Sequence, residues 1–227
     1  DRRLKRAAVP NDTFVTSQWY LTNDYASVSA YGAWNITTGS SSVVVAVLDT
    51  GILPHPDLAG RVLPGYDFIS DVDTANDGDG RDPDPADPGD WVTQTDIESG
   101  KFPDCEKESS SWHGTSVAGI VAANTNNAFA VAGIDWAARI LPVRVLGKCF
   151  GQDSDIQAAM RWAAGIEVAG VPINPNPAKV INLSLGSTGT CSNGYQTVIN
   201  EVVARGVVVV AAAGNSAGEP VGTPANC

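Results

Sequence analysis

Four short runs of β-branched and other apolar residues constrain the fold of this chain more than any other feature. Polar and apolar residues do not alternate along these runs, so we expect both faces of each strand to be covered. Patterns typical of helices lie between them, at residues 113–124, 153–169 and 194–205. Strands that alternate with helices predict an α/β fold with a central, mainly parallel sheet. The predicted strands are Val43–Leu48, Ile140–Leu146, Val180–Leu185 and Val207–Ala212.

The composition is typical of globular proteins and disfavours a membrane or nucleic-acid partner. Of the 227 residues, 43% are hydrophobic. The sequence contains no run of eighteen apolar residues, which is about the length needed to span a membrane. The formal net charge of −11 disfavours contact with phosphates. Residues 71–111 are rich in Asp, Gly and Pro, and we expect them to form a long loop within one domain, not a linker.

Four cysteines without a Cys-x-x-Cys pair indicate two disulfides in an exported protein rather than a zinc site. Four cysteines allow three connectivities, and their spacing excludes none of them. We expect sequential pairing, in which Cys105 binds Cys149 and Cys191 binds Cys227.

The first predicted strand runs directly into Asp49-Thr50-Gly51. Functional groups of open α/β sheets gather at the carboxyl ends of strands, so a carboxylate is well placed there. Asp and Gly are also common in ordinary turns. Asp-Thr-Gly is in addition the hallmark of aspartic peptidases, but these use two carboxylates, and the chain has no second copy of the motif.

His113 is one of only two histidines and opens the predicted helix of small residues, within the segment 112–119. An imidazole that a carboxylate orients is suited to act as a general base. A single histidine is more often structural than catalytic. Its combination with Asp49 and with the motifs that follow favours a catalytic role.

Four segments, in this order, resemble the subtilisin-like serine peptidases (subtilases). The Asp-rich loop and the four cysteines resemble in particular the extracellular proteases of Gram-negative bacteria. The resemblance implies a three-layer α/β/α fold and a secreted endopeptidase that acts on proteins or peptides as a monomer. The matching segments are Val47–Gly51 with His55–Leu58, His113–Thr115 with Val117–Gly119, Ile181–Gly186 and Ala211–Asn215.

In that family Asp49 would orient His113, His113 would take a proton from a serine, and Asn215 would donate to the oxyanion. The segment Ser184-Leu185-Gly186 would pair with the substrate backbone. The family's nucleophile lies in a Gly-Thr-Ser-Met-Ala-like segment downstream of the oxyanion residue, whereas Ser116 belongs to the histidine motif.

No segment of that kind follows Asn215 within this chain. We therefore expect residues 1–227 to be the amino-terminal portion of one catalytic domain, with the nucleophile in a carboxy-terminal remainder. That remainder would be a partner that covers an otherwise exposed core face. The alternatives are an inactive subtilase-like fragment and a binding module.

The resemblance also implies Ca²⁺ as a cofactor. In the family's strong site Asp57 and the side-chain oxygen of Asn127 are ligands, together with the carbonyl oxygens of Thr125, Phe129 and Val131. Asp12 resembles the amino-terminal ligand of thermitase-like members. This chain departs from the family pattern in one respect, because it has one extra residue before Asn127.

A second ion is predicted in the Asp-rich run, where eight aspartates and one basic residue, Arg81, lie between residues 71 and 90. Such a run is either solvated or neutralised by bound cations. The expected ligands are Asp77, Asp79, Asp82 and Asp84, with Asp67 or Asp71 as possible supports.

Overall fold

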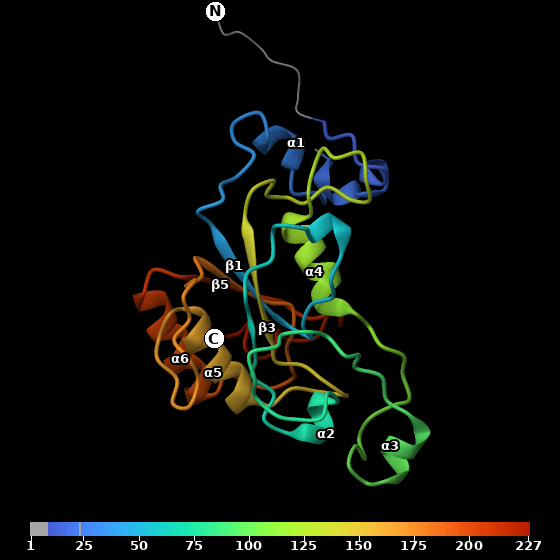
Figure 1. The fold of residues 1–227 in the computed structure, drawn as a ribbon, viewed down its shortest axis with the longest axis vertical. Helices are drawn as coiled ribbons and strands as arrows, with labels where there is room; N and C mark the ends of the chain where they lie inside the picture. The colour runs from blue at the N-terminus through green and yellow to red at the C-terminus, as the bar shows by residue number, and fades with distance from the viewer. Residues whose placement is uncertain (1–8, 23) are drawn as a thin grey trace, which may run out of the picture.

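A parallel five-stranded sheet forms the centre of the computed structural model, which describes residues 9–22 and 24–227 (Figure 1). The strand order is β2-β3-β1-β4-β5, so the first long strand lies in the middle. β1 pairs in parallel with both β3 and β4, and the register places Asp49 opposite Arg144. The strands are β1 (Val44–Asp49), β2 (Tyr66–Asp67), β3 (Arg139–Arg144), β4 (Val180–Leu183) and β5 (Val208–Ala211).

Helices cover both faces of this sheet, which confirms the predicted three-layer α/β fold (Figure 1). α5 (Asp153–Ala163) and α6 (Asn193–Ala204) pack on one face, where the largest hydrophobic core includes Leu141, Met160 and Val198. α4 (His113–Ala122) packs on the other face through Ala118 and Ala122. The small residues of α4 let the helix lie close to β1.

The prediction of a helix over residues 153–169 was too long. α5 ends at Ala163, and Gly165 follows in the left-handed region with φ of 75°. Such a glycine is a common helix stop. Ile166 and Val168 continue the apolar spacing of the helix, but they pack against the core from a loop.

The remaining helices are short and were not predicted. Near the amino terminus they are η1 (Val15–Ser17), η2 (Trp19–Leu21) and α1 (Ala30–Ala33), followed by η3 (Pro56–Leu58). The predicted loop 71–111 is mainly irregular and contains only α2 (Val72–Ala75) and α3 (Gln94–Glu98). These two helices lie at the end of the molecule opposite α1 (Figure 1). No helix in the described part of the chain is long and apolar enough to cross a membrane.

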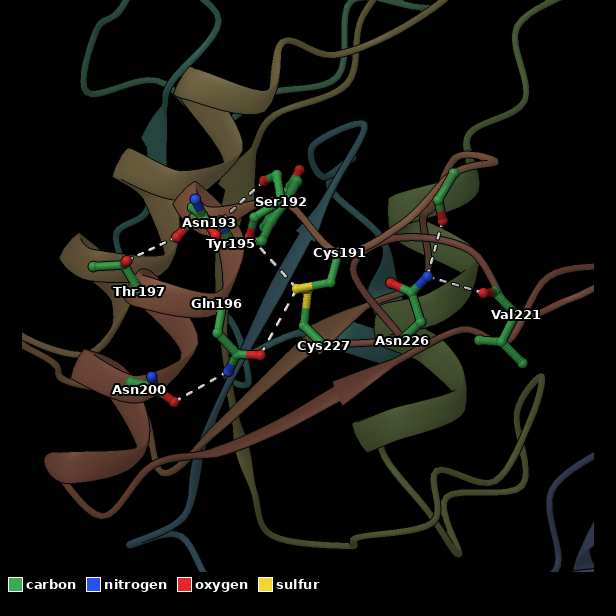
Figure 2. Close-up of a disulfide and its surroundings, with 11 residues drawn as sticks. Cys191, Ser192, Asn193, Tyr195, Gln196, Thr197, Asn200, Val221, Asn226 and Cys227 are labelled. Carbon is green, nitrogen blue, oxygen red and sulfur yellow. Dashed lines mark hydrogen bonds between the residues drawn. A yellow bond between two sulfur atoms is a disulfide. The ribbon is translucent and has the colours of Figure 1, made fainter.

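Both expected disulfides are confirmed, Cys105–Cys149 and Cys191–Cys227. The first joins the loop 71–111 to the segment after β3. The second joins the start of α6 to residue 227, beside Asn226, whose amide donates to the carbonyl of Val221 (Figure 2). Each bridge therefore fixes a long loop to the edge of the sheet where the strands end.

One face of β5 is left uncovered by residues 9–22 and 24–227. Val208 and Val210 are 57% and 49% exposed, although they belong to a strand that pairs with β4. Their side chains alternate with the half-buried Val209 and Ala211, which pack against the main core.

The loop 71–111 is also held by buried charges. The Arg144 side chain is 1% exposed and donates to Asp67, to Asp77 Oδ2 at 2.6 Å, and to the carbonyl oxygen of Ala75. Asp67 has no exposed surface. The pair therefore links β2, β3 and the Asp-rich run inside the protein.

Replacing Arg144 with Met should cost about 3–5 kcal/mol of unfolding free energy, because Asp67 would remain buried without its partner. Chemical denaturation of the full-length protein measures this cost. Lys101→Met is the matched control, because the Lys101–Asp73 pair is half exposed and should contribute less than about 1 kcal/mol. Equal costs for the two variants would contradict this account.

Candidate active site

Asp49 is the last residue of the central strand and has no exposed surface. Its Oδ1 accepts a hydrogen bond from the Thr50 backbone N–H at 2.8 Å. Burial raises the pKa of Asp49 above its usual value, whereas the hydrogen bonds from His113 and Thr50 counteract this effect. A carboxylate in this position needs a cationic or hydrogen-bonding partner.

His113 provides that partner from the first position of α4. Its Nδ1 lies 2.7 Å and 2.9 Å from the two carboxylate oxygens of Asp49. Trp112, just before it, has φ of 52°, which is rare for a large side chain and turns the chain sharply into the helix. The His113 side chain is 44% exposed, so the rest of its ring faces an open space.

That space is a cleft with a volume of about 500 Å³, lined by Thr50 and His113 on one side. Ser184, Leu185 and Gly186, just after β4, line it as well, and their role in substrate binding stays a prediction. The other residues at the cleft include Leu146, Phe150, Ile156, Tyr195, Thr223 and Pro224.

The segment 184–186 is held in place by residues near the end of the chain, at 223–227. Ser187 and Thr223 exchange two backbone hydrogen bonds of 2.9 Å, and the Cys191–Cys227 bridge holds the segment that contains Thr223 (Figure 2). A Cβ on Gly186 would lie 3.1 Å from the Thr223 carbonyl oxygen, so the two chains approach closely there. One edge of the cleft thus depends on this disulfide.

Two other candidate residues lie outside the cleft lining. Asn215, the predicted oxyanion donor, is exposed in the loop after β5, and its oxyanion role stays a prediction. Ser116 Oγ donates back to the Trp112 carbonyl oxygen within α4 at 3.3 Å, as expected for a residue of the histidine motif.

Asp12 and Asp57 converge on the loop 125–131 and are 2% and 1% exposed. Asp12 Oδ2 accepts from Asn126 N–H at 2.8 Å, and Asp57 Oδ2 accepts from Val131 N–H at 3.2 Å. Asp12 Oδ1 is buried and has no partner among the described residues. A buried carboxylate oxygen without a hydrogen bond fits a cation ligand.

Residues with positive and negative φ alternate along this loop, so that successive carbonyl groups point in different directions. Asn126, Ala128 and Ala130 all have positive φ, between 39° and 64°. The even-numbered carbonyls of residues 128, 130 and 132 accept from Thr13, Phe14 and Gln18. Within residues 9–22 and 24–227, no donor reaches the carbonyl oxygens of Thr125, Phe129 or Val131.

Asn127 differs from its predicted role as an oxygen ligand. Its Nδ2 donates to Asp57 Oδ1 at 2.8 Å, and its Oδ1 accepts from Phe129 N–H at 2.9 Å. Because the amide nitrogen faces the Asp57 carboxylate, the amide oxygen cannot bind an ion on that side. The side chain would have to turn over to bind an ion beside Asp57.

In the Asp-rich run the structure brings together three of the four predicted ligands. Carboxylate oxygens of Asp77, Asp79 and Asp82 lie within 4.8 Å of one another. A side-chain hydrogen bond to Asp82 raises the pKa of Asp79. Asp84 is not part of this group, and its Oδ1 accepts from the Ala86 N–H at 3.0 Å.

The possible supports of this group have other partners. Asp67 is the buried partner of Arg144, and Asp71 caps α2 by accepting from the Thr74 N–H at 2.8 Å. Sequence reasoning did not single out Asp87 within the run, although it is buried and contacts Thr50 beside Asp49. Nothing in a run of eight similar aspartates distinguishes Asp87, which contacts Thr50, or Asp90, which lines the cleft.

Comparison with known proteins places the chain in a family. The model of the subtilase family matches residues 40–227. The chain belongs to the subtilase family. An extracellular protease of Xanthomonas campestris pv. campestris is 51% identical over 228 residues, and an extracellular basic protease of Dichelobacter nodosus is 49% identical over 215 residues.

A solved protease of Pseudoalteromonas arctica has the same fold, with a TM-score of 0.83 and 50% sequence identity over 91% of this chain. The present chain spans only part of each relative. It covers 38% of the Xanthomonas protein, 36% of the Dichelobacter protein and 59% of the solved Pseudoalteromonas chain.

Proposed function

We propose that the protein is a secreted serine endopeptidase that hydrolyses peptide bonds of proteins through a Ser-His-Asp triad and an acyl-enzyme. The nucleophilic serine would come from a segment downstream of Cys227, which would also cover β5. The observation that carries the proposal is the pairing of buried Asp49 with His113 at the wall of a cleft. Relatives that are named extracellular proteases support it.

In this mechanism Asp49 holds the Nδ1 side of His113, which leaves Nε2 to accept the serine proton as the hydroxyl attacks the peptide carbonyl. The positive charge that forms on the imidazole is stabilised by the adjacent carboxylate. The same proton then passes to the leaving amine, and water repeats the sequence on the acyl-enzyme.

Substrate and transition state would contact two further elements. The peptide backbone would add to Ser184–Gly186 as an extra strand, since this segment lines the cleft beyond the end of β4. Asn215 would donate its amide to the oxyanion. We further propose that the complete protein is a monomer that acts on proteins or peptides and not on nucleic acid.

An aspartic peptidase and a binding module are the competing interpretations. In an aspartic peptidase two carboxylates share a proton, whereas the direct partner of the Asp49 carboxylate is an imidazole. A binding module would have the fold and the cleft but no reactive serine.

A biotinylated fluorophosphonate tests the proposal, because it bonds covalently only to an activated serine. The full-length protein should be labelled at one serine, which peptide mapping should place outside residues 1–227. Asp49→Asn should reduce casein hydrolysis by about 10⁴-fold, the loss that this substitution causes in other serine peptidases with this triad.

Glu167→Gln, on an exposed loop away from the cleft, is the matched control and should leave the rate unchanged. Hydrolysis that pepstatin blocks and that proceeds without labelling would support the aspartic mechanism. No hydrolysis and no labelling of the folded protein would support the binding module.

We also propose that Asp12 and Asp57, with the loop 125–131, hold a structural Ca²⁺ ion. The orphaned Asp12 Oδ1 and the three carbonyl oxygens without donors support this set. Such an ion would join the amino-terminal segment to the turn after α4. Asp77, Asp79 and Asp82 are proposed to hold another ion.

Removal of Ca²⁺ with a chelator should lower the Tm of the full-length protein, and added Ca²⁺ should restore it. In Asp57→Asn the Tm should be lower and should respond less to Ca²⁺. Asp24→Asn, at an exposed position, is the control and should behave like the unaltered protein. A Tm independent of Ca²⁺ would contradict the proposal.

A further inference from the structure

The turn that carries Asp49 is attached to one segment of the loop 71–111. The Ile52 N–H donates to the Pro85 carbonyl oxygen at 3.0 Å, and the Asp87 N–H donates to the Ile52 carbonyl oxygen at 3.2 Å. A Cβ on Gly51 would lie 2.7 Å from the Pro85 carbonyl oxygen, and Gly51 has φ of 108°. Two segments 30 or more residues apart are thus in direct backbone contact beside the catalytic carboxylate.

The Asp87 side chain points toward the turn after β1, and the residue is 4% exposed. Its Oδ2 accepts from the Thr50 hydroxyl at 2.7 Å, and its Oδ1 accepts from the Gly89 N–H at 2.9 Å. The Thr50 hydroxyl in turn accepts from the Gly114 N–H at 3.0 Å. A chain of hydrogen bonds therefore runs from the loop to the residue after His113.

The direction of this chain follows from the donors available. A hydroxyl has one proton, and an ionised carboxylate can only accept. Asp87 therefore takes the Thr50 proton, and this orientation leaves the hydroxyl lone pairs for the Gly114 N–H. Gly114 has no room for a side chain, because a Cβ there would lie 2.3 Å from the Gly51 carbonyl oxygen.

We propose that Asp87 is a positioning residue for the Asp49–His113 pair and acts through the Thr50 hydroxyl. Thr50 adjoins Asp49 and Gly114 adjoins His113, so a single hydroxyl fixes the turn after β1 against the first turn of α4. The distance between the two catalytic side chains then depends on a carboxylate that touches neither of them.

Asp87 also places negative charge beside the pair. Burial is the main cause that raises the pKa of Asp49, and the charge of Asp87 adds to it; burial also raises the pKa of Asp87 itself. The other charged groups that face Asp87 or share the cleft with His113 are Asp49, Asp90, Glu108, Asp153 and Arg144.

The inference rests on the proposed peptidase function, and its test uses the full-length protein with a peptide substrate. The constants kcat and KM are measured for the unaltered protein and for Asp87→Asn, with active enzyme counted by fluorophosphonate labelling. Asn keeps an acceptor for Thr50 but lacks the charge. A neutral amide binds the Thr50 hydroxyl more weakly than a carboxylate does, so kcat per active site should fall several-fold, with KM changed much less.

Thr50→Val and Thr50→Ser separate positioning from charge. Val fills the same space without a hydroxyl, so kcat per active site should fall by about tenfold, with KM changed much less. Ser restores the hydroxyl and should recover most of the rate. Asp104→Asn, an exposed carboxylate outside the cleft, should match the unaltered protein.

Full kcat per active site in both Asp87→Asn and Thr50→Val would overturn the inference. The same holds if these variants lose thermal stability while kcat and KM per labelled site stay constant, because Asp87 would then be only structural. Absence of hydrolysis in the unaltered protein would instead refute the proposed function.

Discussion

A carboxylate at the end of the central strand, with no exposed surface, is the constraint on which the rest of the site depends. Asp49 follows five residues of β1 that are covered on both faces of the sheet. A buried charge is costly unless it is hydrogen-bonded, and here an imidazole and a backbone N–H meet this need. The position of α4 on the sheet brings that imidazole to Asp49.

The loop 71–111 forms part of the site rather than an appendage. Arg144 binds it from β3, Arg81 binds Asp155 on α5, and the Cys105–Cys149 bridge closes it against the cleft. Its segment 85–87 reaches the turn after β1. These contacts explain how a run with many like charges can fold tightly beside the Asp49–His113 pair. The buried Arg144 pairs with Asp77, and backbone N–H groups donate to Asp71, Asp84 and Asp87.

Much of the fold could be predicted from the sequence because it rests on strong local patterns. The four long strands lie where apolar runs predicted them, and the helix at 113 begins at the expected residue. β2 was missed because two residues, Tyr66 and Asp67, give no periodic signal. The end of α5 was missed because Ile166 and Val168 extend the apolar pattern beyond the helix.

The site was predictable only where a residue belongs to an ordered motif. Asp49 and His113 lie together as the motifs implied. The role inferred for Asp87 depends on tertiary pairing, which no spacing within an Asp-rich run reveals. Asn127 has the expected place, but the neighbouring Asp57 carboxylate and Phe129 N–H determine how its amide is turned.

Alkylation by a peptidyl chloromethyl ketone tests the central claim most directly, because this reagent reacts with the Nε2 of a histidine that is part of a working triad. The chain contains only two histidines, His55 and His113, so His55 is an internal control. Peptide mapping of the inactivated full-length protein should find the adduct on His113 and none on His55. Loss of activity with His113 unmodified, or equal modification of both histidines, would contradict the assignment of His113 as the catalytic base.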